Sequence, residues 1–569
     1  MTTATLPTAR KGWLARVLWH RQLESYPDTT PRILYLGIVV VATIMLYYEL
    51  YVGGAVAPAI IAHFGMTFPF YVNILVVANA IGALASLVAG LADRWGRANL
   101  VVYGLLVTAL LTLFGIPNAP NQLVFALVVI AVAFVEGIIL VATPALVRDF
   151  SPQLGRASAM GFWTLGPVVG SLVVAEVSSN TLPHLPAWQD QFVICGIVGL
   201  VVFAIALLGL RELSPQLRDQ LMVSMRDRVL IEARAKGIDV EASLRHPWRQ
   251  MLHLDVIAPA FAISVFLLIY YTAVGFFTIY FTTNFGFSLS DANGLGNWFW
   301  ALDAAGLIVV GVVSDWLKVR KPFMVVGALG AIVMTIVFLG KTDQPHTGYA
   351  AFVLIISLLA VSLAVAYAPW MASFTETVER RNPALTATGL AVWGLIIRGV
   401  VAASFLCLPF VVSSITPLVE YGSRVQTLAT KYSSQLATLR AIDPQTLATL
   451  DRDPTDQAAL ATAVGEISRA QGVPPEEAVR RLQAAAQVPR SDLAFLQAHG
   501  AQVQRAAAQT PGQWRIWWWV CVGGEVVFLP LILLMAGRWD PRRARQDALE
   551  HERQVEAELR ALGLSGSGS

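Results

Sequence analysis

Long apolar runs separated by short polar stretches dominate the pattern along the chain. Twelve of them come close to or exceed the ~20 residues that a helix needs to cross a bilayer. They lie near 34–60, 70–91, 99–117, 122–147, 159–178, 190–210, 256–283, 290–313, 322–340, 348–373, 385–416 and 514–537. A polar stretch at 211–255 divides the first six runs from the last six. The pattern predicts an all-α polytopic membrane protein whose twelve transmembrane helices form two halves.

Composition supports this class and excludes a soluble globular protein. Of the 569 residues, 56% are hydrophobic and 14% are charged, and the mean hydropathy is +0.61. The net charge of +3 gives no reason to expect a nucleic-acid partner. Five cations within residues 1–32 precede the first apolar run, so we expect no cleavable signal peptide. The three cysteines, Cys195, Cys407 and Cys521, lie in apolar runs, so neither a disulfide nor a metal site is expected.

Lys and Arg residues predict the orientation of the helices. They concentrate in both tails and in every second loop, whereas the loops between them hold almost none, so both termini are expected to be cytoplasmic. The expected organisation is a cytoplasmic tail at 1–33, a first half at 34–210, a cytoplasmic linker at 211–255, helices seven to eleven at 256–416, an extracytoplasmic helical insert at 417–513, helix twelve at 514–537, and a cytoplasmic tail at 538–569 whose last five residues look like a cloning remnant.

A short charged loop occurs at the same place in both halves. Asp93-Arg94-Trp95-Gly96-Arg97 follows the second apolar run, and Asp315 precedes a cluster of cations 222 positions later (315 minus 93). An Asp in such a loop can accept hydrogen bonds from the start of a neighbouring helix, while cations meet lipid phosphates or helix C-termini. These contacts can break and re-form when helices move. We therefore predict a gating role for Asp93, Arg94, Gly96, Arg97 and Asp315.

The loop resembles the signature G-x-x-x-D-R-x-G-R-R, which members of the major facilitator superfamily carry between helices 2 and 3. Its core matches, whereas Ala89 and Ala98 replace the outer Gly and the last Arg. The second copy is weaker, because Trp316 and Lys318 replace the Arg and the second Gly. The resemblance implies two six-helix halves related by an axis along the membrane normal, with a substrate bound between them near the midplane.

Residues 417–513 lie outside this resemblance. The stretch is rich in Ala, Gln, Asp and Arg, and it contains helix starts such as Asp453-Pro454 and Ser491-Asp492. We expect a small helical domain outside the membrane. It is either a solvated decoration, a lid over the outer vestibule or a surface on which a partner docks.

Five charged residues interrupt the apolar runs: Glu49, Glu136, Asp303, Arg398 and Glu525. Charges in a membrane interior are costly and usually mark a transport pathway. Four acids and one base cannot all be ionised there, so we predict that Glu49, Glu136 and Asp303 take part in proton coupling. Glu49 is the first choice, because symporters resembling this chain often carry a proton on such an acid in the first helix. Glu525 is interpreted as structural.

Arg398 must have an anionic partner, because a guanidinium keeps its charge. Asp303, Glu525 and a bound substrate are the candidates. One possibility is a permanent ion pair between Arg398 and Asp303. The other is that a carboxylate or phosphate substrate binds Arg398 and displaces the acid from it. Sugar porters pair the acid of the first helix with an Arg on helix four, but Glu136-Gly137 occupies that region here. A sugar substrate is therefore doubtful.

Aromatic and polar residues on helices that line the cavity in family members complete the predicted binding site. Tyr side chains can grip a ring or a carboxylate. With Arg398, the predicted substrate-binding set is Tyr47, Tyr48, Tyr51, Tyr270, Tyr271, Asn297, Trp300, Tyr367 and Trp370.

These features predict a secondary active transporter that imports a small organic anion with protons across the inner or plasma membrane of a bacterial cell. It is expected to need no cofactor beyond the proton gradient, to bind no metal and to work as a monomer among membrane lipids.

The alternative is a proton-driven efflux antiporter, because Gly166-Pro167-Val168-Val169-Gly170 partly resembles the antiporter signature of drug exporters. No phosphate-binding loop or catalytic constellation is recognisable, so an ATP-driven pump and an enzyme are not expected. A receptor or scaffold would leave the cavity charges idle.

Overall fold

The computed structural model describes residues 18–85, 95–150, 156–217, 247–381 and 385–537, with a few further residues between 539 and 553. Nearly all of them are helical. The chain divides into two compact units, one formed by Met1–Val411 with Trp514–Ser569 and the other by Val412–Gln513. The predicted insert began at residue 417, five positions after the start of the second unit (417 minus 412).

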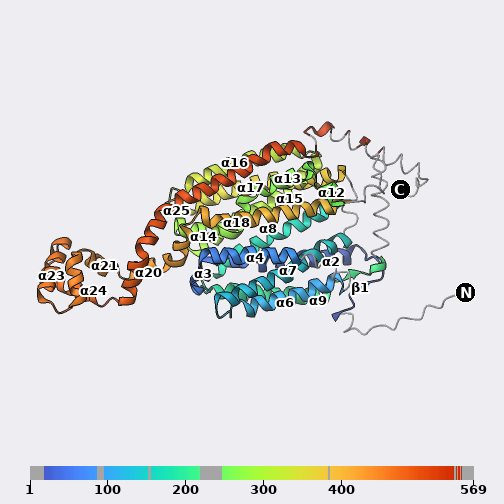
Figure 1. Ribbon diagram of the computed structural model, residues 1–569. Coiled ribbons are helices and arrows are strands. Elements are labelled where there is room, and N and C mark those ends of the chain that lie inside the picture. The colour runs from blue at the N-terminus through green and yellow to red at the C-terminus, as the bar shows by residue number, and fades with distance from the viewer. Residues whose placement is uncertain are drawn as a thin grey trace. The chain divides into compact units, whose positions relative to one another are not determined.

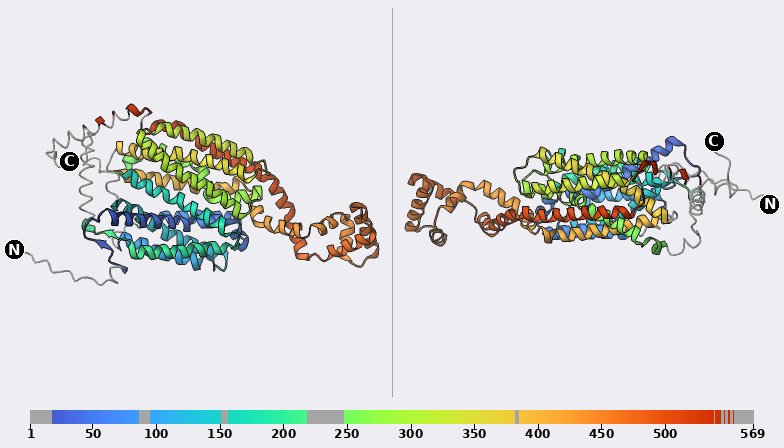
Figure 2. Two further views of the ribbon diagram at one scale, coloured as in Figure 1. Left: turned by 180° about the vertical axis from the view of Figure 1, so that it is seen from behind. Right: turned by 90° about the horizontal axis from the view of Figure 1, so that it is seen from above.

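The long helices of the first unit lie side by side in one bundle (Figures 1 and 2). Its first half consists of α2 (Thr29–Ala55), α3 (Ala57–Phe64), α4 (Phe68–Ala85), α6 (Arg97–Leu110) with the π-helical turn η2 (Leu111–Gly115), α7 (Gln122–Phe150), α8 (Arg156–Thr181) and α9 (Trp188–Gly209). Its second half consists of α12 (Pro247–Met251), α13 (Leu254–Phe266), α14 (Leu268–Phe285), α15 (Leu289–Leu317), α16 (Lys321–Lys341), α17 (Tyr349–Arg381), α18 (Thr386–Val411), the last part of α25 (Arg490–Leu531) and the turn η5 (Ile532–Leu534).

Among the described residues, eleven helical segments are long and apolar enough to cross a membrane. They correspond to eleven of the twelve predicted spans. The remaining span, 159–178, falls on α8, which is a 26-residue helix but is not one of the eleven. Many of its residues are Gly, Ser, Thr or Asn, which lower its hydropathy.

Glycines let the helices of the bundle approach closely. A Cβ at Gly137 on α7 would collide with the backbone of Gly82 on α4, and a Cβ at Gly170 on α8 would lie 2.5 Å from the Tyr47 Cβ on α2. Such small residues are what helices in lipid use to pack against each other, because no hydrophobic force drives them together there. The Gly-Pro stretch of α8 therefore has a packing role against α2.

The two ends of the bundle differ. At the end that carries Gly96 and Arg320, here called the loop end, two short strands, β1 (Gln22–Leu23) and β2 (Glu212–Leu213), pair in parallel. At the other end, here called the closed end, polar bonds join the two halves. Asn293 donates to the Ala55 carbonyl at 3.0 Å, and Ser290 donates to the Ser179 carbonyl at 2.6 Å.

The second unit is a small helical domain with its own apolar clusters. Its helices are α19 (Ile415–Pro417), the π-helical turn η4 (Leu418–Gly422), α20 (Ser423–Lys431), α21 (Ser433–Arg440), α22 (Pro444–Arg452), α23 (Gln457–Gln471), α24 (Pro475–Ala486) and the first part of α25. One cluster is built on Ile442, Ala463, Ile467 and Ala478. Asp443 and Asp456 cap the starts of α22 and α23 through their side chains.

Candidate functional site: a charged cavity between the halves

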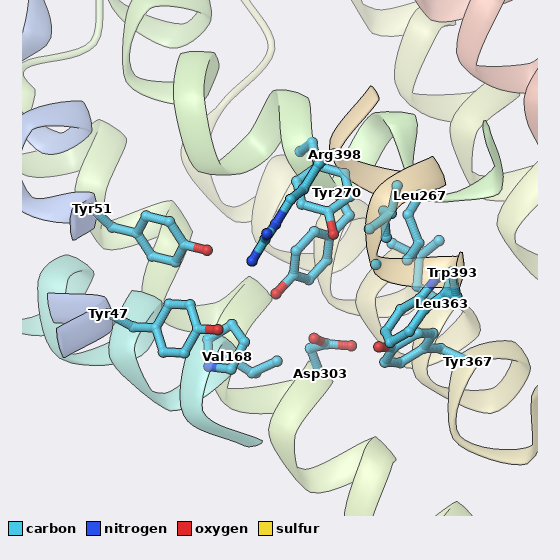
Figure 3. Close-up of a pocket in the computed structure, with 14 residues that line it drawn as sticks. Tyr47, Tyr51, Val168, Leu267, Tyr270, Asp303, Leu363, Tyr367, Trp393 and Arg398 are labelled. Carbon is cyan, nitrogen blue, oxygen red and sulfur yellow. The ribbon is translucent and has the colours of Figure 1, made fainter. Parts of the chain in front are cut away.

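A cavity of about 200 Å³ lies between the two halves of the first unit (Figure 3). Helices α2 and α8 contribute from the first half, and α14, α15, α17 and α18 contribute from the second. The lining residues are Tyr47, Tyr51, Pro167, Val168, Leu267, Tyr270, Tyr271, Asp303, Leu363, Tyr367, Trp393, Gly394, Ile397 and Arg398. Leu267 marks the break between α13 and α14, and irregular backbone at such a depth is tolerated where it lines a cavity.

Arg398 and Asp303 both face this cavity. The Arg398 side chain is exposed, whereas Asp303 is only 3% exposed. In Figure 3 the guanidinium ends near the Tyr51 side of the cavity, apart from the Asp303 carboxylate. Within the described residues, no ion pair or hydrogen bond joins either side chain to another one, so the permanent Arg398–Asp303 pair considered above is not formed in this structure.

Different tyrosines lie near the two side chains. Tyr47 and Tyr271 lie within electrostatic reach of the Arg398 guanidinium. Tyr270 and Tyr367 lie within such reach of the Asp303 carboxyl. The cavity therefore has a guanidinium, Arg398, on one side and a buried carboxyl, Asp303, on another.

Four of the predicted binding residues do not line this cavity: Tyr48, Asn297, Trp300 and Trp370. Tyr48 is 1% exposed, since a helix turns by about 100° per residue and Tyr47 takes the cavity-facing position. Asn297 donates to the Ser179 hydroxyl at 3.0 Å at the closed end. Trp300 lines a small neighbouring cavity with Asn293, and Trp370 is buried against Tyr367, Phe374 and Trp393.

Glu49 and Glu136 line a second cavity of about 150 Å³ rather than the central one. They are 4% and 1% exposed, and none of their carboxyl oxygens has a hydrogen-bond partner among the described residues. Thr108 lies beside Glu49, but its hydroxyl donates to the Leu105 carbonyl at 3.2 Å. Tyr51 and Tyr271 line both cavities, so these two residues separate the cavity that holds the two acids from the central cavity.

The predicted gating loop is described only in part. Asp93 and Arg94 lie outside the described residues. Arg97 forms an ion pair with Asp149 at 2.8 Å, and its backbone N–H donates to Glu212 at 2.6 Å. Gly96 has a φ of 90°, and a Cβ on it would collide with the Glu212 carboxylate. Gly96 is thus required by its backbone conformation and by the close approach of Glu212.

Ion pairs also form at the second copy of the loop. Asp315 bonds Arg320 at 2.7 Å, and Arg320 also reaches Glu376 on α17 at 3.2 Å. Arg320 lies 223 positions after Arg97 (320 minus 97), which is the offset that relates Tyr47 to Tyr270. Arg320, Glu376 and Asp149 were not among the predicted gating residues, although this offset marks Arg320 as the counterpart of Arg97.

The remaining intramembrane acid, Glu525, accepts a hydrogen bond from Thr335 on α16 at 2.7 Å and is fully buried. It lines neither of the two cavities described above.

The apolar lining of the central cavity was not predicted from the sequence, because apolar residues in an apolar run carry no distinguishing signal. It consists of Val168, Leu363, Trp393 and Ile397. In the part of the chain that the structure describes, no group of three His, Cys, Asp or Glu side chains could hold a metal ion.

Comparisons with known proteins bear on the whole arrangement. A sequence profile described as Major Facilitator Superfamily matches residues 39–416. Among curated proteins, no sequence matches that of this chain.

Several solved structures are similar to the chain. A bacterial homologue of the human lysosomal transporter Spinster, in an inward-facing and occupied conformation, is 16% identical with a TM-score of 0.52, over 92% of this chain and 99% of that one. A D-xylose-proton symporter is 15% identical with a TM-score of 0.51, over 67% and 90% of the two chains. The xylose transporter of E. coli, partially occluded and inward open, is 15% identical with a TM-score of 0.50, over 66% and 92%. At such identities the likeness shows the fold alone.

Proposed function

Because the chain belongs to the Major Facilitator Superfamily, whose members are multi-pass membrane transporters and not enzymes, we propose that it is a proton-coupled symporter of a small organic anion. The observation that carries this proposal is the Arg398 guanidinium, which faces the central cavity and has no anionic partner within the described residues. A guanidinium keeps its charge and binds carboxylates and phosphates through two parallel hydrogen bonds. A sugar would not require such a group.

Proton coupling is assigned to the acids, with Glu49 and Glu136 as the main carriers and Asp303 as the third candidate. Two unpaired carboxylates in one buried cavity repel each other, and a bound proton relieves that cost. Since Tyr51 and Tyr271 separate them from the central cavity, movement of these rings on substrate binding would expose the acids to it. The fold is compatible with this chemistry, because one similar structure is a D-xylose-proton symporter.

Alternating access would use the two ends of the bundle in turn. Bonds of Asn293 and Ser290 join the halves at the closed end, which we assign to the outside. The ion pairs of Arg97 and Arg320 lie at the loop end, which we assign to the cytoplasm.

We further propose that the protein works as a monomer in the inner or plasma membrane, and that the 417–513 insert offers a surface to a partner.

Transport by the purified protein in liposomes tests the proposal. The panel contains small carboxylates and phosphate esters, with and without an ammonium group, and uptake is measured relative to protein-free liposomes, because neutral carboxylic acids cross lipid. Acid outside should drive uptake of at least one of them, and Arg398→Gln or Arg398→Lys should lower that uptake at least tenfold without changing the amount of folded protein. Glu525→Gln is the control, since this buried acid lies outside both cavities. Absence of any acid-driven uptake would overturn the proposal.

A proton-driven efflux antiporter is the second candidate function. Phe125, Phe192 and Phe405 line the second cavity together with its two acids, and this combination suits a lipophilic cation. In the same liposomes, movement of a cationic dye toward the acidic side of the membrane, driven by protons that move the other way, would support antiport. Its absence, combined with anion uptake, would exclude it.

A further inference from the structure

The central cavity is lined by a carboxyl and a guanidinium that do not pair with each other. Removing a carboxylate or a guanidinium from water costs several kcal/mol, and a direct ion pair is the usual compensation. Asp303 on α15 and Arg398 on α18 both line the cavity, yet no bond joins them. The exposed Arg398 is free to bind an anion that enters the cavity, whereas the buried Asp303 carboxyl is compensated either by a proton or by a cation that enters.

The surroundings of each charge differ in a way that matches different ligand groups. Tyr47 and Tyr271 beside Arg398 offer hydroxyls that can donate to an anion already held by the guanidinium. The rings of Tyr270, Tyr367 and Trp393 also line the cavity, and the Tyr367 hydroxyl points toward the Asp303 side in Figure 3. Aromatic faces next to a carboxylate attract ammonium groups, and the attraction is stronger in a desolvated site.

The size of the cavity limits the ligand. At about 200 Å³ it is smaller than the ~300 Å³ at which sites for drug-sized ligands begin. A ligand of this size that touches both regions must carry its two charged groups only a few bonds apart.

We propose that the substrate is a small zwitterion, whose carboxylate or phosphate binds Arg398 and whose ammonium group binds Asp303. This inference rests on the proposed symport of an organic anion and narrows its substrate class. It also separates the roles of the acids: Asp303 holds the substrate, and the proton is carried by Glu49 and Glu136.

Charge movement follows from this assignment. A zwitterion with one carboxylate and one ammonium group has no net charge, so its entry with one proton moves one positive charge across the membrane. A monoanion that enters with one proton moves none. A membrane potential that is negative inside should therefore accelerate uptake of a zwitterion and leave uptake of a monoanion unchanged.

Binding of matched ligand pairs to the purified full-length protein tests the substrate class. Each pair consists of a zwitterion and the carboxylate of the same shape that lacks the charged nitrogen: alanine and isobutyrate, glycine betaine and 3,3-dimethylbutyrate, 4-aminobutyrate and pentanoate. At least one zwitterion should bind about tenfold more tightly than its partner. Asp303→Asn should remove this preference without weakening the carboxylate, whereas Arg398→Gln should weaken both.

Two controls keep the outcome clear. Asp303→Glu retains the charge and should retain part of the preference, which a merely misfolded variant would not. Glu525→Gln, which alters a buried acid outside the cavity, should bind every pair as the unaltered protein does. Equal binding within all three pairs, an unchanged preference in Asp303→Asn, or no binding of any probe would overturn the inference.

Failure of this inference and failure of the proposed function have different signatures. Acid-driven uptake of anions without a preference for zwitterions would contradict the inference and leave anion symport intact. Selective zwitterion binding without any acid-driven uptake would support the substrate class and contradict proton-coupled symport.

Discussion

At the scale of single residues, a few positions have a backbone or a neighbour that only one residue type tolerates. Gly96 combines a φ of 90° with the approach of the Glu212 carboxylate, which accepts from the N–H groups of Arg97 and Ala98 at the start of α6. Glu212 thus caps this helix from 115 positions away along the chain (212 minus 97). A side chain at Gly96 would displace the cap.

We expect Gly96→Ala to destabilise the protein by about 1–3 kcal/mol, because alanine is strained at this φ and its Cβ collides with Glu212. The measurement is the temperature of unfolding of the purified protein in detergent. Gly37→Ala is the matched control: Gly37 lies in α2 with nothing within 4 Å of an added Cβ, so its unfolding temperature should stay the same or rise slightly. Equal behaviour of the two variants would contradict this account of Gly96.

At the scale of elements, the N-terminal segment before α2 fastens the ends of two helices at the loop end. Arg21 is fully buried and donates to the Leu207 carbonyl in the last turn of α9 at 2.5 Å, and to the Asn99 side chain at the start of α6 at 3.0 Å. Burial, together with the charge of Arg211, lowers the pKa of Arg21, but a guanidinium starts so high that it stays charged. A cation at this place stabilises the negative end of the helix dipole.

We expect Arg21→Gln to destabilise the protein by about 2 kcal/mol, because the neutral amide leaves the α9 carbonyls without a charged donor. Lys341→Gln is the control, since Lys341 ends α16 and, among the described residues, makes an exposed hydrogen bond to the nearby Gln344. Unfolding temperatures of both variants, compared with that of the unaltered protein, check the difference. Equal shifts of the unfolding temperature in the two variants would show that the hydrogen bonds of the buried Arg21 contribute nothing to the stability of the protein.

At the scale of the whole transmembrane unit, the two halves are bonded at the closed end through α2, α8 and α15. The Ser179 hydroxyl accepts from Asn297, and the Ser179 carbonyl accepts from Ser290. A transporter that alternates between two open states must break these bonds once in each cycle. Their stability therefore sets part of the balance between the two states.

We expect a covalent link at this place to stop transport. The double variant Ser179→Cys with Gly294→Cys should form a disulfide under oxidising conditions, because a Cβ on Gly294 would lie 3.9 Å from the Ser179 Cβ, within the range that a disulfide spans. Uptake in liposomes should fall at least tenfold after oxidation and recover on reduction, whereas Ser179→Cys alone should be insensitive to both treatments. Full uptake by the oxidised double variant would mean that the closed end does not open during transport.

Much of the architecture could be predicted from the order of residues alone. Apolar runs of about 20 residues have few alternatives to transmembrane helices, because lipid cannot satisfy exposed backbone groups. The repeated loop at Asp93 and Asp315 indicated the family and the two related halves, and the family is confirmed. The charged residues within the runs were also recognisable, since each is an expensive exception that composition makes conspicuous.

The tertiary structure decided which of these residues share a space. Tyr47 faces the central cavity while Tyr48 does not, and Glu49 lies with Glu136 behind Tyr51 in a cavity apart from Arg398. It also left Asp303 and Arg398 unpaired although both lie in the same cavity. The position of a residue within an apolar run indicates how deep it lies in the membrane. The direction in which its side chain points depends on how the helices rotate and pack, and this is decided by contacts between residues hundreds of positions apart.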